Sequence, residues 1–252
     1  MHFRNLAKIA TAALLSIALI PATAVAANSN VSISFSNPDT VPITGTAKLS
    51  QTLIKNKGSV SDNGKTYDGT LQGEVDAKDL FDDAYTMYKN HMEKKFVGPF
   101  FYRRPVKNFI MYDNGEKFPT MHLKVKFPTN FAVNKDNIEA TANTSIISEV
   151  SHVYDSANNT VDITYKLGNW NDYEGFFKLV EEERNSSNNH PLKLSIPYSV
   201  KLDNTTEQKL GDITLQGDCH LYKYGRLNPE GTPILDITST MTVPVNKRLV
   251  KQ

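Results

Sequence analysis

Two aromatic segments carry the side chains best suited to holding a ligand, and the first lies between two prolines. Residues 98–105 contain three aromatic rings and two arginines in a row: Phe100, Phe101, Tyr102, Arg103 and Arg104. Aromatic rings and arginine are enriched where proteins bind partners, and rings also stack on sugars. The segment predicts an exposed binding platform. The alternative interpretation is a connector whose rings fill the core beneath a helix.

The second aromatic segment holds Trp170, the one tryptophan of the chain, with Tyr173 close behind it. Asparagines flank Trp170 on both sides, and amides beside an indole ring are suited to a loop that stacks on a sugar. A strand-to-helix corner that packs Trp170 inward is the alternative interpretation.

A covalent cross-link between side chains is a further candidate for chemistry. Cys219 is the one cysteine, so the chain cannot form an intramolecular disulfide. Some exported β domains without disulfides instead join a buried lysine to an asparagine through an amide bond. Lys48, in an early strand, and Asn246, after the last strand, have the chain order that such a bond requires. Two solvated side chains are the alternative.

Signatures of catalysis and of metal binding are missing from the sequence. The chain has no Gly-x-Ser-x-Gly elbow, no His-Glu-x-x-His motif, no phosphate-binding glycine loop and no Cys-x-x-Cys pair. His122 and His220 lie in strand-like runs without metal-ligand spacing. Glu181, Glu182 and Glu183 are adjacent, which is typical of a solvated helix face. We therefore predict a protein that is not an enzyme and that uses no metal or cofactor.

The first 26 residues predict export. Arg4 and Lys8 precede an apolar run from Ile9 to Ile20, and the small residues 24–26 form a cleavage signal. Charge, a short apolar run and small residues in that order are typical of a secretory signal peptide. The run is too short to span a membrane, which takes about 20 residues, and no second apolar span follows. We expect a secreted chain, held at a cell surface only by non-covalent contacts if at all.

The balance of charged residues limits the classes of partner that the chain can bind. The chain has 28 Lys and Arg residues against 27 Asp and Glu residues, so it lacks the basic surplus that nucleic-acid binding requires. The expected partner is a protein or glycan ligand outside the cell.

Alternation of apolar and polar residues predicts that most of the chain after the leader forms strands, which position the candidate side chains. Residues 122–127, 161–167 and 192–202 alternate in this way, as half-buried strands do. Such strands are typical of antiparallel sheets. Pro197 interrupts one run, so that strand must have an edge position or a bulge there.

Two segments have helical spacing instead. In residues 79–96, acidic residues come first and lysines last, which suits the helix dipole. Residues 173–184 form the second, shorter helix, with Asp172 as its N-cap and Phe176, Phe177 and Val180 on its apolar face.

Two further stretches resemble a known family. The runs from His122 to Ile138 and from Leu192 to Leu202, followed by residues 210–213 and 217–222, are similar to strands of adhesin-type immunoglobulin-like domains in Gram-positive surface and secreted proteins. The resemblance covers roughly residues 117–245. It implies a β-sandwich that displays, spaces or binds rather than catalyses.

These observations combine into one prediction of fold and function. We expect a mainly β protein, an antiparallel sandwich with two helical insertions at 79–96 and 173–184. After the signal peptide, one module would cover residues 27–104 and a second 105–252, unless residues 27–246 form one continuous domain. The expected function is that of a secreted bacterial, non-enzymatic binding or structural protein of adhesin type. The alternative is a secreted carbohydrate-binding or carbohydrate-active protein that uses Trp170 and Tyr173.

Overall fold

The structure, a computed structural model, describes part of the 252-residue chain. The described residues are 32–33, 43–48, 54–78, 81, 85–86, 88–89, 96–97, 104–105, 110–113, 118–168, 172–202, 209–225 and 228–247. The predicted signal peptide at residues 1–26 lies outside them. The named elements are β1 (Ser32–Ile33), β2 (Ile43–Lys48), β3 (Ile54–Val60), β4 (Thr66–Asp76), β5 (Phe96–Val97), β6 (Arg104–Pro105), β7 (Tyr112–Asp113), β8 (Thr120–Lys126), β9 (Phe131–Val133), the 3-10 turn η3 (Lys135–Asn137), β10 (Glu139–Ala142), β11 (Ile147–Asp155), β12 (Thr160–Leu167), α2 (Tyr173–Asn185), β13 (Pro191–Lys201), β14 (Lys209–Gly225) and β15 (Asn228–Asn246).

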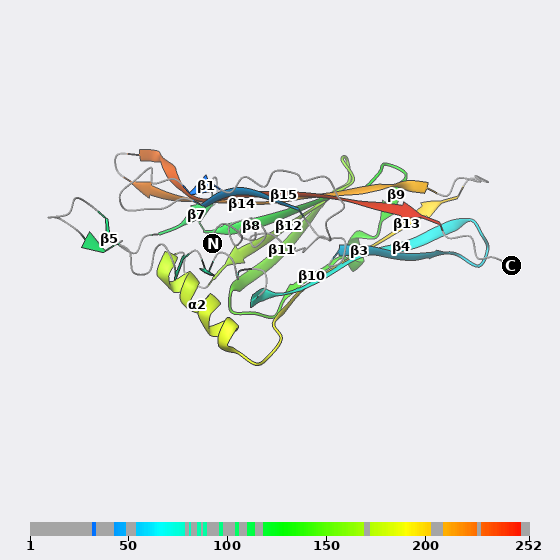
Figure 1. Cartoon of the computed structure of the whole chain (residues 1–252). Helices are drawn as coiled ribbons and strands as arrows, with labels where there is room; N and C mark the ends of the chain where they lie inside the picture. Colours follow the sequence, from blue (N-terminus) through cyan, green and yellow to red (C-terminus); the bar gives the residue numbers. More distant parts are fainter. Residues whose placement is uncertain are drawn as a thin grey trace, which may run out of the picture.

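All of these strands except β5 and β6, which pair with each other, form two layers, and this confirms the predicted mainly β, antiparallel architecture (Figure 1). The eight-stranded sheet has the order β1-β2-β15-β14-β8-β12-β11, and β7 also pairs with β14. The five-stranded sheet has the order β10-β13-β4-β3, and β9 also pairs with β13. Within these sheets every described pair is antiparallel except β15 with β2, which run parallel.

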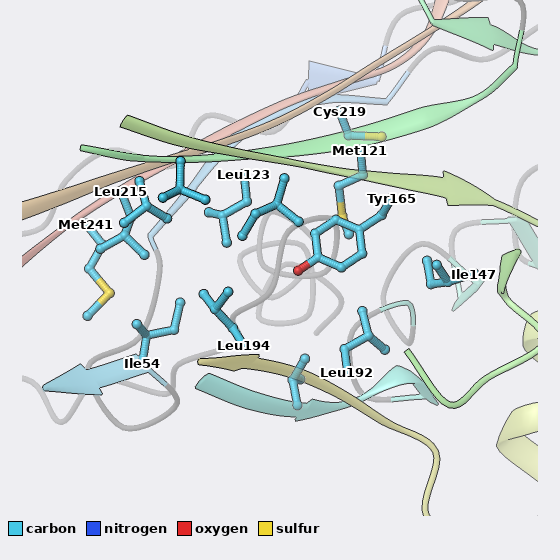
Figure 2. Close-up of a cluster of buried hydrophobic side chains, with 14 of the residues drawn as sticks. Ile54, Met121, Leu123, Ile147, Tyr165, Leu192, Leu194, Leu215, Cys219 and Met241 are labelled. Carbon is cyan, nitrogen blue, oxygen red and sulfur yellow. The ribbon is translucent and has the colours of Figure 1, made fainter. Parts of the chain in front are cut away.

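The core lies between the two layers because each strand turns its apolar alternate residues inward. In β12, Val161, Ile163 and Tyr165 are buried, whereas the residues between them are partly exposed. Leu192 and Leu194 of β13 face them from the other sheet, and Figure 2 shows the side chains of the two layers pointing toward one another. The period of two in the sequence therefore corresponds to one dry and one wet face of each sheet.

Helix α2 lies beside the sandwich and has the predicted start. The Asp172 side chain accepts a 2.7 Å hydrogen bond from the Gly175 N–H and so caps the helix. Tyr173, Phe176, Phe177 and Val180 are buried on one face. Glu183 is also buried, with 5% of its surface exposed. The prediction that all three glutamates lie on a solvated face is therefore wrong for Glu183.

The earlier predicted helix has different ends from those expected. Ala77 and Lys78 are already helical, and so are the described residues 81, 85–86 and 88–89. Phe96 belongs to β5, so the predicted end at residue 96 is wrong. Phe81 contacts Phe176 edge-on, and Tyr88 stacks on Phe177 with ring centroids 4.4 Å apart. These aromatic contacts bind the segment to α2.

Each of the two sheets contains strands that come before Arg104 in the sequence and strands that come after it. In the five-stranded sheet, β4 pairs with β13 along the whole of β13, from Pro191 opposite Asp76 to Lys201 opposite Thr66. In the eight-stranded sheet, β2 pairs with β15. Strands from before and after Arg104 are therefore neighbours in each sheet, and the division of the chain into one domain or two modules stays a prediction.

No helix in the described ranges has the length and hydropathy to cross a membrane.

Candidate functional site

The predicted aromatic platform falls largely outside the described residues. This applies to Phe100, Phe101, Tyr102 and Arg103, and to Trp170 in the second segment. Arg104 lies in β6, where its backbone pairs with Val97 of β5. The role of these side chains in binding stays a prediction.

Tyr173 lies in the core and not on the surface that was predicted to bind a ligand. Its surface is only 4% exposed, and its ring contacts Tyr88 and Phe177 at centroid distances of 5.4 and 5.1 Å. Burial raises the pKa of its hydroxyl above the ordinary tyrosine range. The helical pattern explains this position, because Tyr173 is the first residue of the apolar face of α2. Its ring packs against protein and does not form a surface for a sugar.

The strand register also separates Lys48 from Asn246. Lys48 lies opposite Thr240 in β15, whereas Asn246 lies opposite Lys209 in β14. Six residues of extended strand span about 20 Å, which is farther than the two side chains can bridge. Asn246 is also exposed, so it lacks the buried setting that the proposed amide bond needs. The structure does not bring this pair together.

Sequence reasoning missed a buried acid beside a histidine on the outer face of the eight-stranded sheet. The Oδ2 atom of Asp113 lies 2.6 Å from Nε2 of His122 and also accepts a hydrogen bond from the Thr120 hydroxyl. The Thr120 hydroxyl is itself 3.0 Å from the same Nε2 atom. A nucleophile and an orienting acid must occupy opposite nitrogens of a catalytic histidine. Here Asp113 and the Thr120 hydroxyl share Nε2, while the Thr164 hydroxyl lies 3.4 Å from Nδ1, which is too long for a well-formed hydrogen bond. The cluster joins β7, β8 and β12.

A second cluster, at the end of α2, has its groups in the order found in hydrolases. Nε2 of His190 is 3.1 Å from the Ser186 hydroxyl, and Nδ1 is 3.1 Å from Oε2 of Glu183. Oε1 of Glu183 accepts hydrogen bonds from the backbone and side chain of Ser145 and from Thr144. The Ser186 oxygen also accepts the Asn188 N–H in the turn that ends the helix. These bonds hold the end of α2 against the turn before β11.

Metal ligands do not gather in the part of the chain that the structure describes: no group of three or more His, Cys, Asp or Glu side chains is arranged to bind a metal ion there. Cys219 is buried, and its Sγ lies 3.6 Å from the Thr120 carbonyl oxygen.

The surface around β3 is the best candidate for a binding site. A groove of about 520 Å³ lies between β3 and the end of β15, and a shallow trough of about 400 Å³ lies on the outer face of the five-stranded sheet. Lys55 and Lys57 line both hollows. We call this region the β3 surface. Its groove is lined by Ile54, Lys55, Asn56, Lys57, Gly58, Tyr67, Val243, Pro244 and Asn246, and its trough by Lys55, Lys57, Gln72, Gly73, Glu74, Glu139, Lys193, Leu194 and Ser195.

Strand register explains why the trough is polar. Glu139 pairs with Ser195, Ser195 with Gln72, and Gln72 with Lys55, so one row of polar side chains crosses four strands. In the next row Lys193 lies 3.9 Å from Glu74. The lysines of β3 thus lie at the positive end of a mixed polar face, where amide and hydroxyl groups are available for hydrogen bonds.

A hydrogen-bond network fixes the floor of the groove. Asn56 donates to the Tyr67 hydroxyl at 2.8 Å, and the Tyr198 hydroxyl donates to the Asn56 oxygen at 2.6 Å. Gly58 and Gly69 make room for these rings, since a Cβ at Gly69 would lie 2.5 Å from the Tyr198 ring. The network holds the β3 backbone between Lys55 and Lys57 in a fixed position.

Sequence reasoning missed the β3 surface because β3 lacks a clear alternation. Its sequence, Ile-Lys-Asn-Lys-Gly-Ser-Val, places Asn56 and Gly58 on the inner face where apolar residues are expected. The glycines that accommodate the tyrosines could have been recognised only from the pairing partners.

Solved structures provide the comparison with known proteins. The chain is similar to BcpA, the major pilin subunit of Bacillus cereus, with TM-score 0.31 and 8% identity over 77% of this chain and 39% of that chain. It is similar to ACE19, the collagen binding subdomain of Enterococcus faecalis surface protein ACE, with TM-score 0.30 and 7% identity over 77% of this chain and 97% of that chain. A cohesin module from a Clostridium perfringens family 33 glycoside hydrolase gives TM-score 0.26 and 10% identity, covering 78% and 98% of the two chains.

The similarity to these Gram-positive pilin and adhesin structures is weak, with TM-scores of 0.31 and 0.30. The chain spans about two fifths of the BcpA chain. At these identities the likeness concerns the fold alone. No protein-family model and no curated protein matches the chain.

Proposed function

We propose that this protein acts outside the cell as a non-enzymatic binding module of adhesin type, with the β3 surface as its ligand-binding face. The observation that carries the proposal is the placement of Lys55 and Lys57 between two hollows on one exposed side of the sandwich. The leader predicted at residues 1–26 supports the extracellular location.

The chemistry of the surface defines the expected ligand. Two lysines, the amides of Asn56 and Gln72 and the hydroxyl of Ser195 can bind carboxylate and carbonyl groups. An open groove beside an edge strand suits an extended chain better than a compact small molecule. We therefore expect an acidic extracellular protein.

The test compares two double variants of the mature chain in surface plasmon resonance against a panel of immobilised extracellular-matrix proteins and bacterial wall preparations. Lys55→Glu with Lys57→Glu should weaken binding roughly tenfold or more, because it reverses both charges at the site. Lys124→Glu with Lys126→Glu makes the same charge change on the outer face of the other sheet and should leave binding unchanged. Equal loss in both variants would contradict a specific β3 surface, and an absence of binding across the panel would favour a purely structural module.

The aromatic segment from Phe100 to Arg104 is the second proposed surface, on sequence grounds. In the same assay, Tyr102→Ala with Arg103→Ala tests it. Loss of binding in this variant, with binding by the β3 variant unaffected, would show that the ligand binds the aromatic segment and not the β3 surface.

The carbohydrate alternative now depends on Trp170, since Tyr173 is buried. Specific glycan-array binding that is lost in Trp170→Ala would support it.

A further inference from the structure

Strand β11 ends the eight-stranded sheet and presents one unpaired edge. Its inner side pairs with β12 from Ile147 opposite Leu167 to Asp155 opposite Thr160. Among the described residues no strand pairs with its other side. In Figure 1 the series β8, β12 and β11 shows β11 as the last strand on this side of the sheet. An unpaired edge exposes backbone N–H and C=O groups that can pair with another strand.

Other strands at sheet edges in this protein have features that discourage such pairing. β9 has three residues and β10 has four, so each of them offers a short edge. β3 is longer but carries Lys55 and Lys57, and charged residues on an edge oppose association. β11 is the exception among them, with nine residues.

The centre of β11 has the composition of a strand that pairs readily. Residues 150–154, Val-Ser-His-Val-Tyr, contain no carboxylate, lysine, arginine, proline or glycine. Val153 is 68% exposed, which makes it one of the two large exposed apolar side chains of the described residues. Uncharged segments rich in β-branched and aromatic residues have a high tendency to add to other strands.

The carboxylates at the ends of β11 are already occupied. Glu149 accepts a 2.7 Å hydrogen bond from Lys166 of β12. Asp155 accepts hydrogen bonds from the Asn158 side chain at 2.6 Å and from the Ala157 N–H. These contacts hold both charges near their own chain.

We propose that the free edge of β11 pairs antiparallel with β11 of a second copy of this chain, about a two-fold axis at Val153. Symmetry requires that residues facing each other lie on the same side of the sheet, so the axis must pass through a residue position. With the axis at Val153, the two Val153 side chains meet, Ser151 faces Asp155, and His152 faces Tyr154. This register buries Val153 and places no like charges opposite each other.

The registers with the axis at His152 or at Ser151 are less favourable. An axis at His152 sets Glu149 opposite Asp155 twice, and like charges directly opposite each other destabilise a strand pair. An axis at Ser151 sets Val153 opposite Glu149. The proposed pairing is independent of the β3 surface, and its small area makes the dimer weak and concentration-dependent.

A cysteine placed at the axis tests both the pairing and its register. Cys219 is 1% exposed, so Val153→Cys introduces one accessible thiol. Oxidation with copper phenanthroline in air should give a disulfide-linked dimer, since Cβ atoms directly opposite in an antiparallel pair are about 4.5–5.5 Å apart. Ser151→Cys is the matched control, because it is on the same face of the same strand but faces Asp155, and its dimer should form far more slowly. Equal rates for the two variants would overturn the proposal.

The unmodified chain gives the second readout. Sedimentation velocity should show a monomer–dimer equilibrium, with a dissociation constant of about 10 μM to 1 mM. Val153→Lys should remove the dimer, whereas Ser59→Lys on the β3 edge should not. Circular dichroism confirms that each variant is folded. A chain that stays monomeric at about 1 mM would overturn the proposal, as would a Val153→Lys variant that loses ligand binding without any change in sedimentation.

Discussion

Two buried tyrosines of the core differ in what their hydroxyl groups contact. Tyr198 donates a 2.6 Å hydrogen bond to Asn56, and its ring stacks on Phe131. Tyr165 is fully buried between the layers, and its hydroxyl has no hydrogen-bond partner in the described part of the chain (Figure 2). Burial without a partner costs free energy and raises the pKa of the Tyr165 hydroxyl above the ordinary range.

Removal of these hydroxyls should have opposite effects on stability. Tyr165→Phe should leave the free energy of unfolding unchanged or raise it by about 1 kcal/mol, because an unpaired polar group leaves the core. Tyr198→Phe should lower it by about 1 kcal/mol, because Asn56 loses its donor. Urea unfolding of both variants measures the difference. A clear loss of stability in Tyr165→Phe would show that its hydroxyl has a partner.

Asp218 makes the outer face of the eight-stranded sheet sensitive to pH. Burial raises the pKa of its carboxyl, and Asp113 adds to this, while His122, His220 and Lys124 act in the opposite direction. The folded state therefore favours the protonated acid. Its contribution to stability is present below the ordinary carboxyl pKa and is lost as the pH rises through the raised value.

Asp218→Asn should remove this pH dependence. We expect the free energy of unfolding of the variant, relative to the natural chain, to increase as the pH rises from the ordinary carboxyl pKa through the raised pKa of Asp218, and then to level off. Urea unfolding at a series of pH values measures the difference between the two proteins. A difference that is constant over this range would contradict the shift.

At the scale of elements, Glu183 is the residue through which α2 is held to the sandwich. Glu183→Ala should lower the free energy of unfolding by about 2–4 kcal/mol, since the buried Ser145 and Thr144 donors lose their acceptor and the helix end loses its contact with Nδ1 of His190. Glu182→Ala, one residue earlier and exposed, is the matched control and should change it by less than about 0.5 kcal/mol. Thermal and urea unfolding measure both. Equal effects would mean that the helix end is held by other contacts.

Alternation made β8, β12 and β13 predictable, because each has one face in the core and one in solvent. The pairing of β13 explains why Pro197 is tolerated in this strand. Pro197 lies in the gap between the residues of β13 that pair with β10 and those that pair with β9. There, no ladder partner requires the N–H that proline lacks. The β3 surface could not be found in this way, since it depends on which strands become neighbours.

Neither the charge pattern nor the sequence motifs could identify the polar clusters around His122 and Glu183. Asp113 and His122 are nine residues apart, and β7 and β8 bring them together at the eight-stranded sheet. The three glutamates of α2 look alike in sequence, yet one of them is buried. Only the fold of the turn at residues 143–146 onto the helix end distinguishes Glu183 from its neighbours.

At the scale of the whole molecule, the two layers form one core that draws on both ends of the chain. Ile54, Tyr67, Leu71 and Val75 come from before Arg104, and they are buried against strands that come after it. β13 pairs with β4 along its entire length. A chain without its first hundred residues would therefore lose β3 and β4, two of the five strands of the sheet that β13 belongs to.

This interleaving predicts a single cooperative unfolding transition for the mature chain. Far-UV circular dichroism and tryptophan fluorescence should give the same urea midpoint, because neither half retains a core after the other unfolds. A fragment of residues 105–252 should be unfolded, since it lacks β3 and β4 and leaves Leu192 and Leu194 without their neighbours on β4. Two separate transitions, or a fragment with native-like near-UV dichroism, would instead support two modules that meet near Arg104.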